Sequence, residues 1–146
     1  MFPILIVDDS REDRDLAEHV IREAKILNPV WRFPSGETCL NFLTGLYSGA
    51  QGFQEPCLIF VDLAMPVMSG PQTIAAINDK LNIPRQFIVM LSGLTDTKLI
   101  REGYQLGART FLSKPLTVVD LNRFFETNEA TFLKQLTAPG YVLRWL

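Results

Sequence analysis

The stretch PILIVDDSREDRD, residues 3–15, decides the fold and raises the first chemical question about this chain. Its apolar run, residues 4–7, has the length of a strand and stops at two adjacent carboxylates, Asp8 and Asp9. A turn alone does not need two like charges, which repel by roughly 4 kcal/mol at about 4 Å and an effective dielectric constant near 20. The pair therefore predicts a role beyond chain reversal at the end of a buried strand.

The composition is that of an ordinary globular protein. With 146 residues, of which 47% are hydrophobic and 21% charged, the chain is long enough for one well-cored domain. Its net charge is −2 and its Lys and Arg residues are scattered, which argues against nucleic acid as a partner. We also expect no membrane partner and a cytoplasmic location, because the sequence shows neither a span-length apolar run nor a leader. Cys39 and Cys57 are expected to be buried, structural thiols.

Strand-length apolar runs alternate with amphipathic stretches of helical length. Such a pattern predicts an α/β protein with a doubly wound parallel sheet covered by helices on both faces. The predicted strands cover 3–7, 30–34, 57–61, 87–91 and 109–112, and the predicted helices cover 10–27, a segment capped by Ser35, 71–81, 96–106 and 117–136. We expect a long Gly-rich loop over 44–56, a domain over 1–136 with an extended last helix, and an apolar C-terminal tail over 137–146.

Polar side chains stand at the carboxyl ends of four predicted strands. Asp8 and Asp9 follow the first strand, Asp62 the third, Ser92 the fourth and Lys114 the fifth. In open parallel sheets, ligands bind outside these strand ends, where the strand order reverses. Three converging carboxylates favour a hard dication with oxygen ligands, such as Mg²⁺. A carboxylate beside Mg²⁺ and an ammonium can attack a phosphoryl group, and Asp62 is the candidate nucleophile.

Four motifs carry a resemblance to a known family. They are VDDS (7–10), FVDLAMPVMSG (60–70), MLSG (90–93) and GARTFLSKP (107–115). Over about residues 3–127, the chain resembles the response-regulator receiver domain of two-component signalling. This resemblance implies a flavodoxin-like (βα)5 fold with a central five-stranded parallel sheet. It also implies that Asp62 accepts a phosphoryl group from a sensor histidine kinase and that the protein acts as a switch of protein–protein interactions.

The resemblance implies a metal site. Asp9, Asp62 and the backbone carbonyl of Ala64 would bind Mg²⁺ directly, and Asp8 would do so through water. Ala64 also carries no side chain that could position or exclude a hydrolytic water, so the lifetime of the phosphorylated form stays open.

The resemblance also implies contacts for the phosphoryl group and a route for the signal. Ser92 and Lys114 would contact the phosphate, and Phe111 matches an aromatic switch position that would move with Ser92. The family has a cis peptide bond at the position of Lys114–Pro115.

The long loop 44–56, in a chain without an output module, resembles the regulators that partner bacterial phytochrome histidine kinases. The sequence does not identify the cognate kinase, its stimulus or the downstream target.

Two other functions stay open at this point. One is a Mg²⁺-dependent aspartyl phosphatase or phosphotransferase, although such enzymes commonly need a second Asp where this chain has Ala64. The other is a receiver-like binding module that works without phosphorylation. The preferred interpretation is a single-domain regulator that catalyses its own phosphorylation and has no other enzymatic activity.

The C-terminal segment carries more apolar surface than one helix face hides. Phe132, Leu133 and Leu136 are followed by YVLRWL, residues 141–146. An exposed patch of this kind is a liability for a monomer, which predicts a symmetric homodimer through the fourth helix, the fifth strand, the fifth helix and the tail. The alternative is that the tail folds back over its own domain and shields loop 44–56.

Overall fold

A computed structural model describes residues 1–49, 52–93 and 95–146 of the chain. Its central sheet has five parallel strands in the order β2-β1-β3-β4-β5. These strands are β1 (Ile4–Val7), β2 (Val30–Phe33), β3 (Leu58–Asp62), β4 (Phe87–Ser92) and β5 (Thr110–Ser113). The predicted doubly wound parallel sheet is confirmed, and the strand order reverses between β1 and β3.

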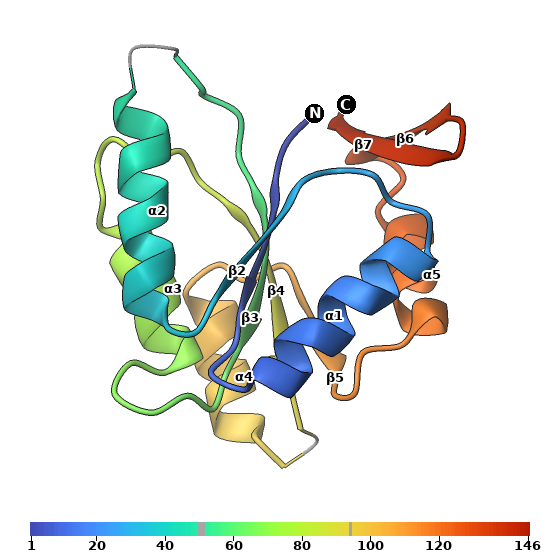
Figure 1. Ribbon diagram of the computed structural model, residues 1–146. Coiled ribbons are helices and arrows are strands. Elements are labelled where there is room, and N and C mark those ends of the chain that lie inside the picture. The colour runs from blue at the N-terminus through green and yellow to red at the C-terminus, as the bar shows by residue number, and fades with distance from the viewer. Residues whose placement is uncertain (50–51, 94) are drawn as a thin grey trace.

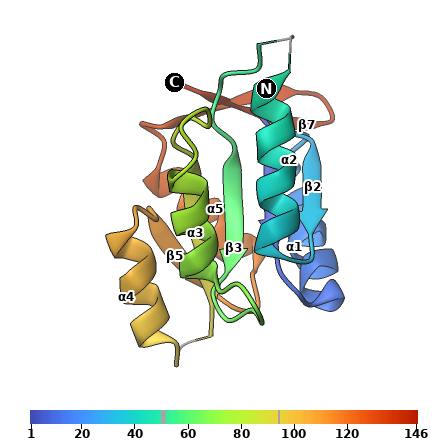
Figure 2. The same cartoon turned by 90° about the vertical axis from the view of Figure 1, so that its left-hand side faces the viewer.

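Helices cover both faces of this sheet, as Figures 1 and 2 show. Helices α1 and α5 lie on one face, and α2, α3 and α4 lie on the other. Their bounds are α1 (Arg11–Glu23), α2 (Gly36–Ser48), α3 (Gly70–Asn78), α4 (Thr97–Gln105) and α5 (Val118–Thr127). Within the described ranges, none of the helices has the length and apolar character that a membrane crossing requires.

Alternating side chains of the strands supply two hydrophobic cores. In β1, Ile4 and Ile6 pack into the cluster that includes α1 and α5, whereas Leu5 and Val7 pack into the cluster that includes α2 and α3. All four side chains are fully buried. The continuous apolar run predicted a strand buried on both faces, and this is what the period of two along a strand produces.

Several helix ends differ from the predicted ones, and α3, for example, ends at Asn78 instead of continuing to residue 81. Helix α1 ends at Glu23 instead of continuing to residue 27, and Lys25 then has a positive φ of 65°. Helix α2 continues to Ser48, so the first part of the expected loop 44–56 is helical. Residues 50 and 51 of that loop lie outside the described residues.

The C-terminal segment forms a β-hairpin, so the predicted extended last helix over 117–136 was wrong. Helix α5 ends at Thr127, where the Asn128 side chain donates a hydrogen bond to the Phe124 carbonyl at 2.8 Å. Strands β6 (Phe132–Thr137) and β7 (Gly140–Trp145) then pair antiparallel. Residues 137–146, expected as a tail, therefore contain the end of β6, the turn and β7.

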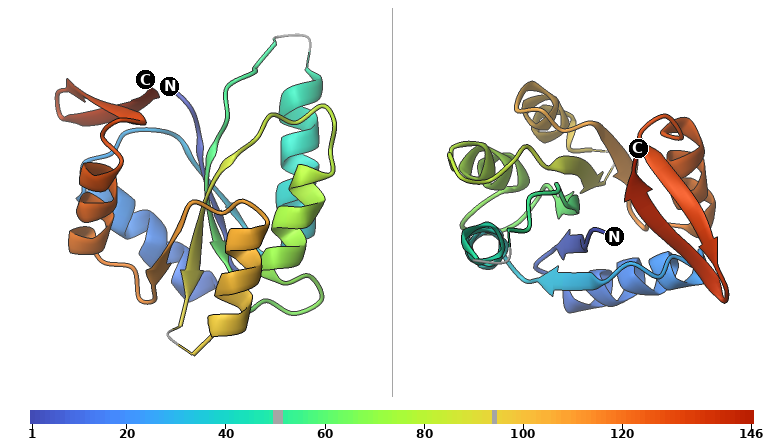
Figure 3. Two further views of the ribbon diagram at one scale, coloured as in Figure 1. Left: turned by 180° about the vertical axis from the view of Figure 1, so that it is seen from behind. Right: turned by 90° about the horizontal axis from the view of Figure 1, so that it is seen from above.

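The hairpin packs on its own domain, as the alternative hypothesis for the tail proposed. Leu143 is fully buried, and the Trp145 ring lies 4.4 Å from the Phe2 ring between centroids. The Trp145 indole N–H donates to the carbonyl of Pro56, at the end of the expected long loop, at 3.0 Å. Figure 3 shows the hairpin at the end of the sheet that lies nearest the N-terminus.

Candidate functional site

Three carboxylates meet at the carboxyl ends of β1 and β3, where the strand order reverses. One oxygen of each of Asp8, Asp9 and Asp62 lies within 4.8 Å of the others. Asp8 and Asp62 are buried, whereas Asp9 is exposed. The sequence predicted this convergence, because parallel strands bring their carboxyl ends to the same edge of a sheet.

Lys114, directly after β5, brings a positive charge into the cluster. Its Nζ atom lies 2.7 Å from Asp8 Oδ2 and 3.2 Å from Asp62 Oδ1. A third contact, at 3.0 Å, joins Nζ to Oδ2 of Asp13, a residue of the first turn of α1. The peptide bond between Lys114 and Pro115 is cis, as expected.

Burial and charge together set the electrostatics of this cluster. Burial, followed by the neighbouring Asp8 charge, raises the pKa of Asp62 to about 6, while Lys114 acts in the opposite direction. Burial alone would lower the pKa of Lys114, but the contacts with Asp8, Asp13 and Asp62 outweigh it and place this pKa above its ordinary value. One ammonium therefore compensates the repulsion among the carboxylates only in part, which leaves the site attractive to a further cation.

The donor set fits a hard dication. All three groups offer carboxylate oxygens, the ligands that Mg²⁺ prefers. The exposed carboxylate of Asp9 faces water, which suits an ion that keeps several of its own waters. The Ala64 amide donates to Asp62 Oδ1 at 3.4 Å, so Ala64 lies beside the cluster; its carbonyl as a ligand stays a prediction.

Ser92 and Phe111 lie on the neighbouring strands β4 and β5. The Ser92 hydroxyl is 2.8 Å from the Gly93 carbonyl oxygen and 3.1 Å from Asp96 Oδ2, so it is engaged with its own loop. Phe111 is half-buried and lines a groove of about 450 Å³ with residues of α4, including Ile100 and Tyr104. Their roles as a switch stay a prediction.

Gly70 fixes the loop that follows Asp62. Its amide donates to the Leu63 carbonyl at 2.9 Å, and a Cβ atom at this position would lie 2.7 Å from the Asp62 carbonyl oxygen. Ser69 and Gln72 form a capping box at the start of α3. Glycine is therefore required here because the chain turns back closely against the strand that carries Asp62.

Sequence reasoning missed three residues around the site. Asp13 contacts Lys114, Asp96 accepts from Ser92, and Arg14 donates from Nη1 to the Asp8 carbonyl at 2.7 Å. The signal for Asp13 and Arg14 was the capping serine, because a helix that begins at Ser10 places its first turn beside Asp8 and Asp9.

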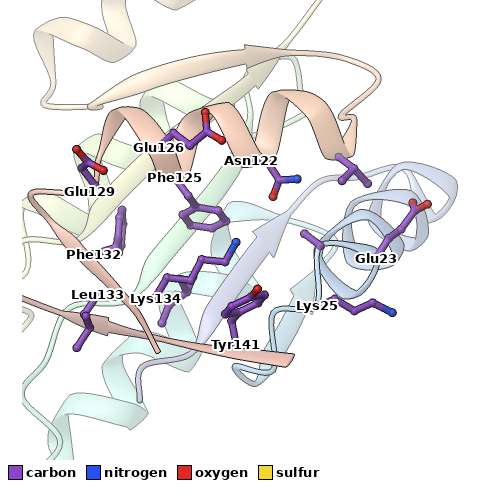
Figure 4. A pocket seen from close by; sticks show the side chains of 13 residues that line it. Glu23, Lys25, Asn122, Phe125, Glu126, Glu129, Phe132, Leu133, Lys134 and Tyr141 are labelled. Carbon is purple, nitrogen blue, oxygen red and sulfur yellow. The ribbon is translucent and has the colours of Figure 1, made fainter. Parts of the chain in front are cut away.

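A larger groove, of about 660 Å³, lies away from the carboxylates, between α1, α5 and the hairpin. Figure 4 shows Glu126 of α5 and Glu129, just after this helix, on one side and Lys134 and Tyr141 of the hairpin on the other. The Lys134 ammonium lies 4.3 Å from the centre of the Tyr141 ring. None of the predicted site residues lines this groove, so its volume does not identify the reactive centre.

Comparison with known proteins gives a family match over most of the chain. The family model described as the response regulator receiver domain matches residues 4–126. Response regulator Rcp1 of Synechocystis sp. is 26% identical over 139 residues, which are 94% of this chain and 92% of that protein.

Solved structures show the same fold. The Vibrio cholerae chemotaxis protein CheY4 matches with a TM-score of 0.69 at 26% identity, over 87% of this chain and 98% of that one. The bacteriophytochrome response regulator AtBRR matches with a TM-score of 0.75 at 23% identity, over 94% and 98%. The Mn²⁺-bound form of Rcp1 matches with a TM-score of 0.67 at 24% identity, over 96% and 100%.

Proposed function

This chain belongs to the response regulator receiver domain family, and we propose on that basis that Asp62 accepts a phosphoryl group from a sensor histidine kinase. The single observation that carries the proposal is the convergence of Asp8, Asp9, Asp62 and Lys114 at the carboxyl edge of the sheet. A nucleophilic carboxylate beside an ammonium and beside two further carboxylates that can hold a cation is an arrangement suited to phosphoryl acceptance.

In the proposed reaction, an Asp62 carboxylate oxygen attacks the phosphorus of a phosphohistidine. A P–O bond forms, the P–N bond breaks, and the imidazole nitrogen keeps the electron pair of that bond. Lys114, at 3.2 Å from Asp62 Oδ1, donates to a phosphoryl oxygen and offsets its negative charge. Ser92 donates to another phosphoryl oxygen once its hydroxyl leaves Asp96.

Asp8, Asp9 and Asp62, with the Ala64 carbonyl, would hold Mg²⁺. When bound, this ion would neutralise negative charge on the oxygens around the phosphorus. The all-oxygen donor set, with three carboxylates against one ammonium, supports this assignment. The Mn²⁺-bound form reported for Rcp1 is consistent with a divalent cation at an acidic site of this fold.

Intact mass spectrometry tests the proposal. Incubation with phosphoramidate and MgCl₂ should add one phosphoryl group to the wild-type chain and none to Asp62→Asn, because the amide is not a nucleophile at neutral pH. EDTA should abolish labelling. Asp79→Asn, which removes an exposed carboxylate at the end of α3, is the matched control and should label like the wild type.

Equal labelling of Asp62→Asn would assign the phosphoryl group to another residue. Undiminished labelling in EDTA would contradict a role for the carboxylate cluster in binding a divalent cation.

The proposed phosphoryl donor is a sensor histidine kinase of the bacteriophytochrome type. The likeness to Rcp1 and to the bacteriophytochrome response regulator AtBRR supports this choice. Transfer from the isolated, autophosphorylated kinase to Asp62 should exceed transfer from an unrelated histidine kinase at equal concentration. Equal rates from both kinases would count against this pairing.

We retain a homodimer as a proposal, but we no longer place the second strand of the hairpin, β7, in its interface. The apolar residues of β7 pack inward, so they no longer call for a second chain. Exposed apolar side chains remain on β6, at Leu133 and Leu136, and are also found on α4 and α5, at Tyr104 and Val119, which are 44% and 64% exposed. Light scattering should show a two-chain mass that Tyr104→Ser lowers and Leu81→Ser, at a fully exposed distant residue, does not. A monomer in the tens of micromolar, phosphorylated or not, would contradict it.

A further inference from the structure

The Lys114 ammonium is surrounded by three carboxylates, of which one lies outside the predicted site. An ammonium has three N–H donors, and here three acceptors lie within 3.2 Å: Asp8 Oδ2, Asp13 Oδ2 and Asp62 Oδ1. Asp13 is not part of the cluster whose oxygens lie within 4.8 Å of one another. It therefore contacts the catalytic lysine without being a member of the metal-binding set.

The contact with Asp13 differs from the contact with Asp8 in its place relative to the acidic cluster. Lys114 Nζ donates a hydrogen bond of 3.0 Å to Asp13 Oδ2. Asp8 Oδ2 lies 2.7 Å from Nζ and forms an ion pair with it. Both carboxylates thus attract the ammonium, but only Asp8 belongs to the acidic cluster, among the residues that the structure describes.

The start of α1 explains why the Asp13 side chain is free to make this contact. Ser10 caps the helix, and its hydroxyl accepts from the Asp13 amide at 3.3 Å. In a capping box, the carboxylate three residues after the cap would accept from the backbone N–H of the cap residue. That N–H already donates to Asp8 Oδ1 at 3.0 Å. The Asp13 carboxylate accepts from Lys114 instead. Asp8 therefore accepts from the backbone at the start of α1, and Asp13 contacts the lysine of the site.

We propose that Asp13 is a positioning residue that keeps the Lys114 ammonium beside Asp62 while the other carboxylates change partners. When a cation and a phosphoryl group occupy the site, oxygens of Asp8 and Asp62 serve those groups, and Asp13 is the acceptor that Lys114 retains. This inference rests on the proposed function of Asp62. The side chain of Asp13 is 44% exposed, so its replacement leaves no buried hole.

Kinetics of labelling by phosphoramidate, followed by intact mass, test this role. Asp13→Asn should lower the maximal rate by roughly five- to tenfold and leave the half-saturating donor concentration unchanged, because orientation of Lys114 matters in the transition state. Asp13→Glu, which keeps the carboxylate, should recover most of the rate. Glu12→Gln is the matched control, because it removes a negative charge from the same first turn of α1 and so has the same effect on the helix dipole. This variant should label at the wild-type rate.

Mg²⁺ titration followed by amide NMR shifts gives a readout that is independent of phosphorylation. The dissociation constant of Asp13→Asn should stay within about twofold of the wild-type value, because Asp13 is not a member of the cluster. A wild-type labelling rate in Asp13→Asn would overturn the inference, as would a loss of Mg²⁺ affinity that parallels the loss of rate. Absence of labelling in the wild-type chain itself would instead overturn the proposed function.

Discussion

Asp8 and Asp9 are neighbours in sequence, yet they have different surroundings. Successive side chains of an extended chain point to opposite sides, so Asp8 is buried against Lys114 while Asp9 is exposed. Asp8 Oδ1 accepts from the Ser10 amide, which fixes its orientation. The like-charged pair therefore supplies one anchored carboxylate and one that meets water, which is the combination that a hydrated Mg²⁺ ion needs.

The two thiols illustrate how burial controls reactivity away from the site. Burial raises the pKa of Cys57 to about 11, although a hydrogen bond with Tyr47 acts to lower it. Burial raises the pKa of Cys39 further. A raised pKa lowers the thiolate fraction at every pH below it, and the thiolate is the reactive form. We predict that iodoacetamide at pH 8 modifies neither thiol in the folded chain and both in urea, as measured by intact mass. Rapid addition of one equivalent to the folded chain would contradict this.

Most site residues could be predicted from the sequence, because their positions follow from strand ends. Asp8, Asp9, Asp62 and Lys114 each follow an apolar run, and a parallel sheet brings such residues to one edge. Asp13 could not be predicted in the same way. The capping serine indicates that Asp13 lies near the site, but the contact with Lys114 arises because the Ser10 N–H donates to Asp8 and not to Asp13, which the sequence pattern does not indicate.

At the scale of elements, the hairpin is the feature that the sequence pattern misrepresented. Phe132, Leu133 and Leu136 have spacings that also fit one face of a helix continuing α5. The Asn128 side chain ends that helix through hydrogen bonds to the Phe124 carbonyl and the Thr127 hydroxyl, and β6 is stabilised by its pairing with β7 and by the burial of Phe132 in the core. The five βα units were predictable from local periodicity, whereas the hairpin depends on a partner strand and on contacts far away in the chain.

Asn28 joins this hairpin to the start of the sheet. It is fully buried, and its side-chain amide donates to the carbonyls of Phe2 and Leu143 at 2.8 and 3.0 Å. Its Oδ1 accepts from the Leu143 amide at 2.7 Å. We predict that Asn28→Ala lowers the free energy of unfolding by about 3 kcal/mol, because buried backbone groups lose their partners.

Urea unfolding of the variant and the wild type measures this loss. Asn82→Ala, at an exposed position between α3 and β4, is the matched control and should stay within about 0.5 kcal/mol of the wild type. A loss below about 1 kcal/mol in Asn28→Ala would mean that the hairpin is not held through this residue.

At the scale of the molecule, the two ends of the sheet carry different features. The carboxyl ends of the strands hold the acidic cluster, and the opposite end holds the hairpin, packed against Phe2 ahead of β1. The hairpin thus completes the core on the α1 and α5 side without covering Asp62. We expect phosphorylation of Asp62 to act through β4, α4 and β5, which carry Ser92, the groove and Phe111.

We predict that a phosphoryl mimic changes the packing of these elements. In the described structure, the Ser92 hydroxyl is engaged with Gly93 and Asp96, so it must leave them to reach a group on Asp62. Phe111 lines the groove against α4 and is only half-buried, which permits a second packing. A ligand shifts such an equilibrium only by its differential affinity for the two states, and the contact with Ser92 supplies that difference.

Hydrogen exchange with beryllofluoride and Mg²⁺ measures the change. We expect altered amide exchange over residues 92–93 and 95–112 in the wild-type chain and none in Asp62→Asn. Ser92→Ala should bind the mimic more weakly and lose the change around Phe111, because the hydroxyl links the phosphoryl group to β4 and α4. Changes confined to residues 8–10 and 62–70 would show that the mimic binds without moving this face, and the transmitted switch would then be wrong.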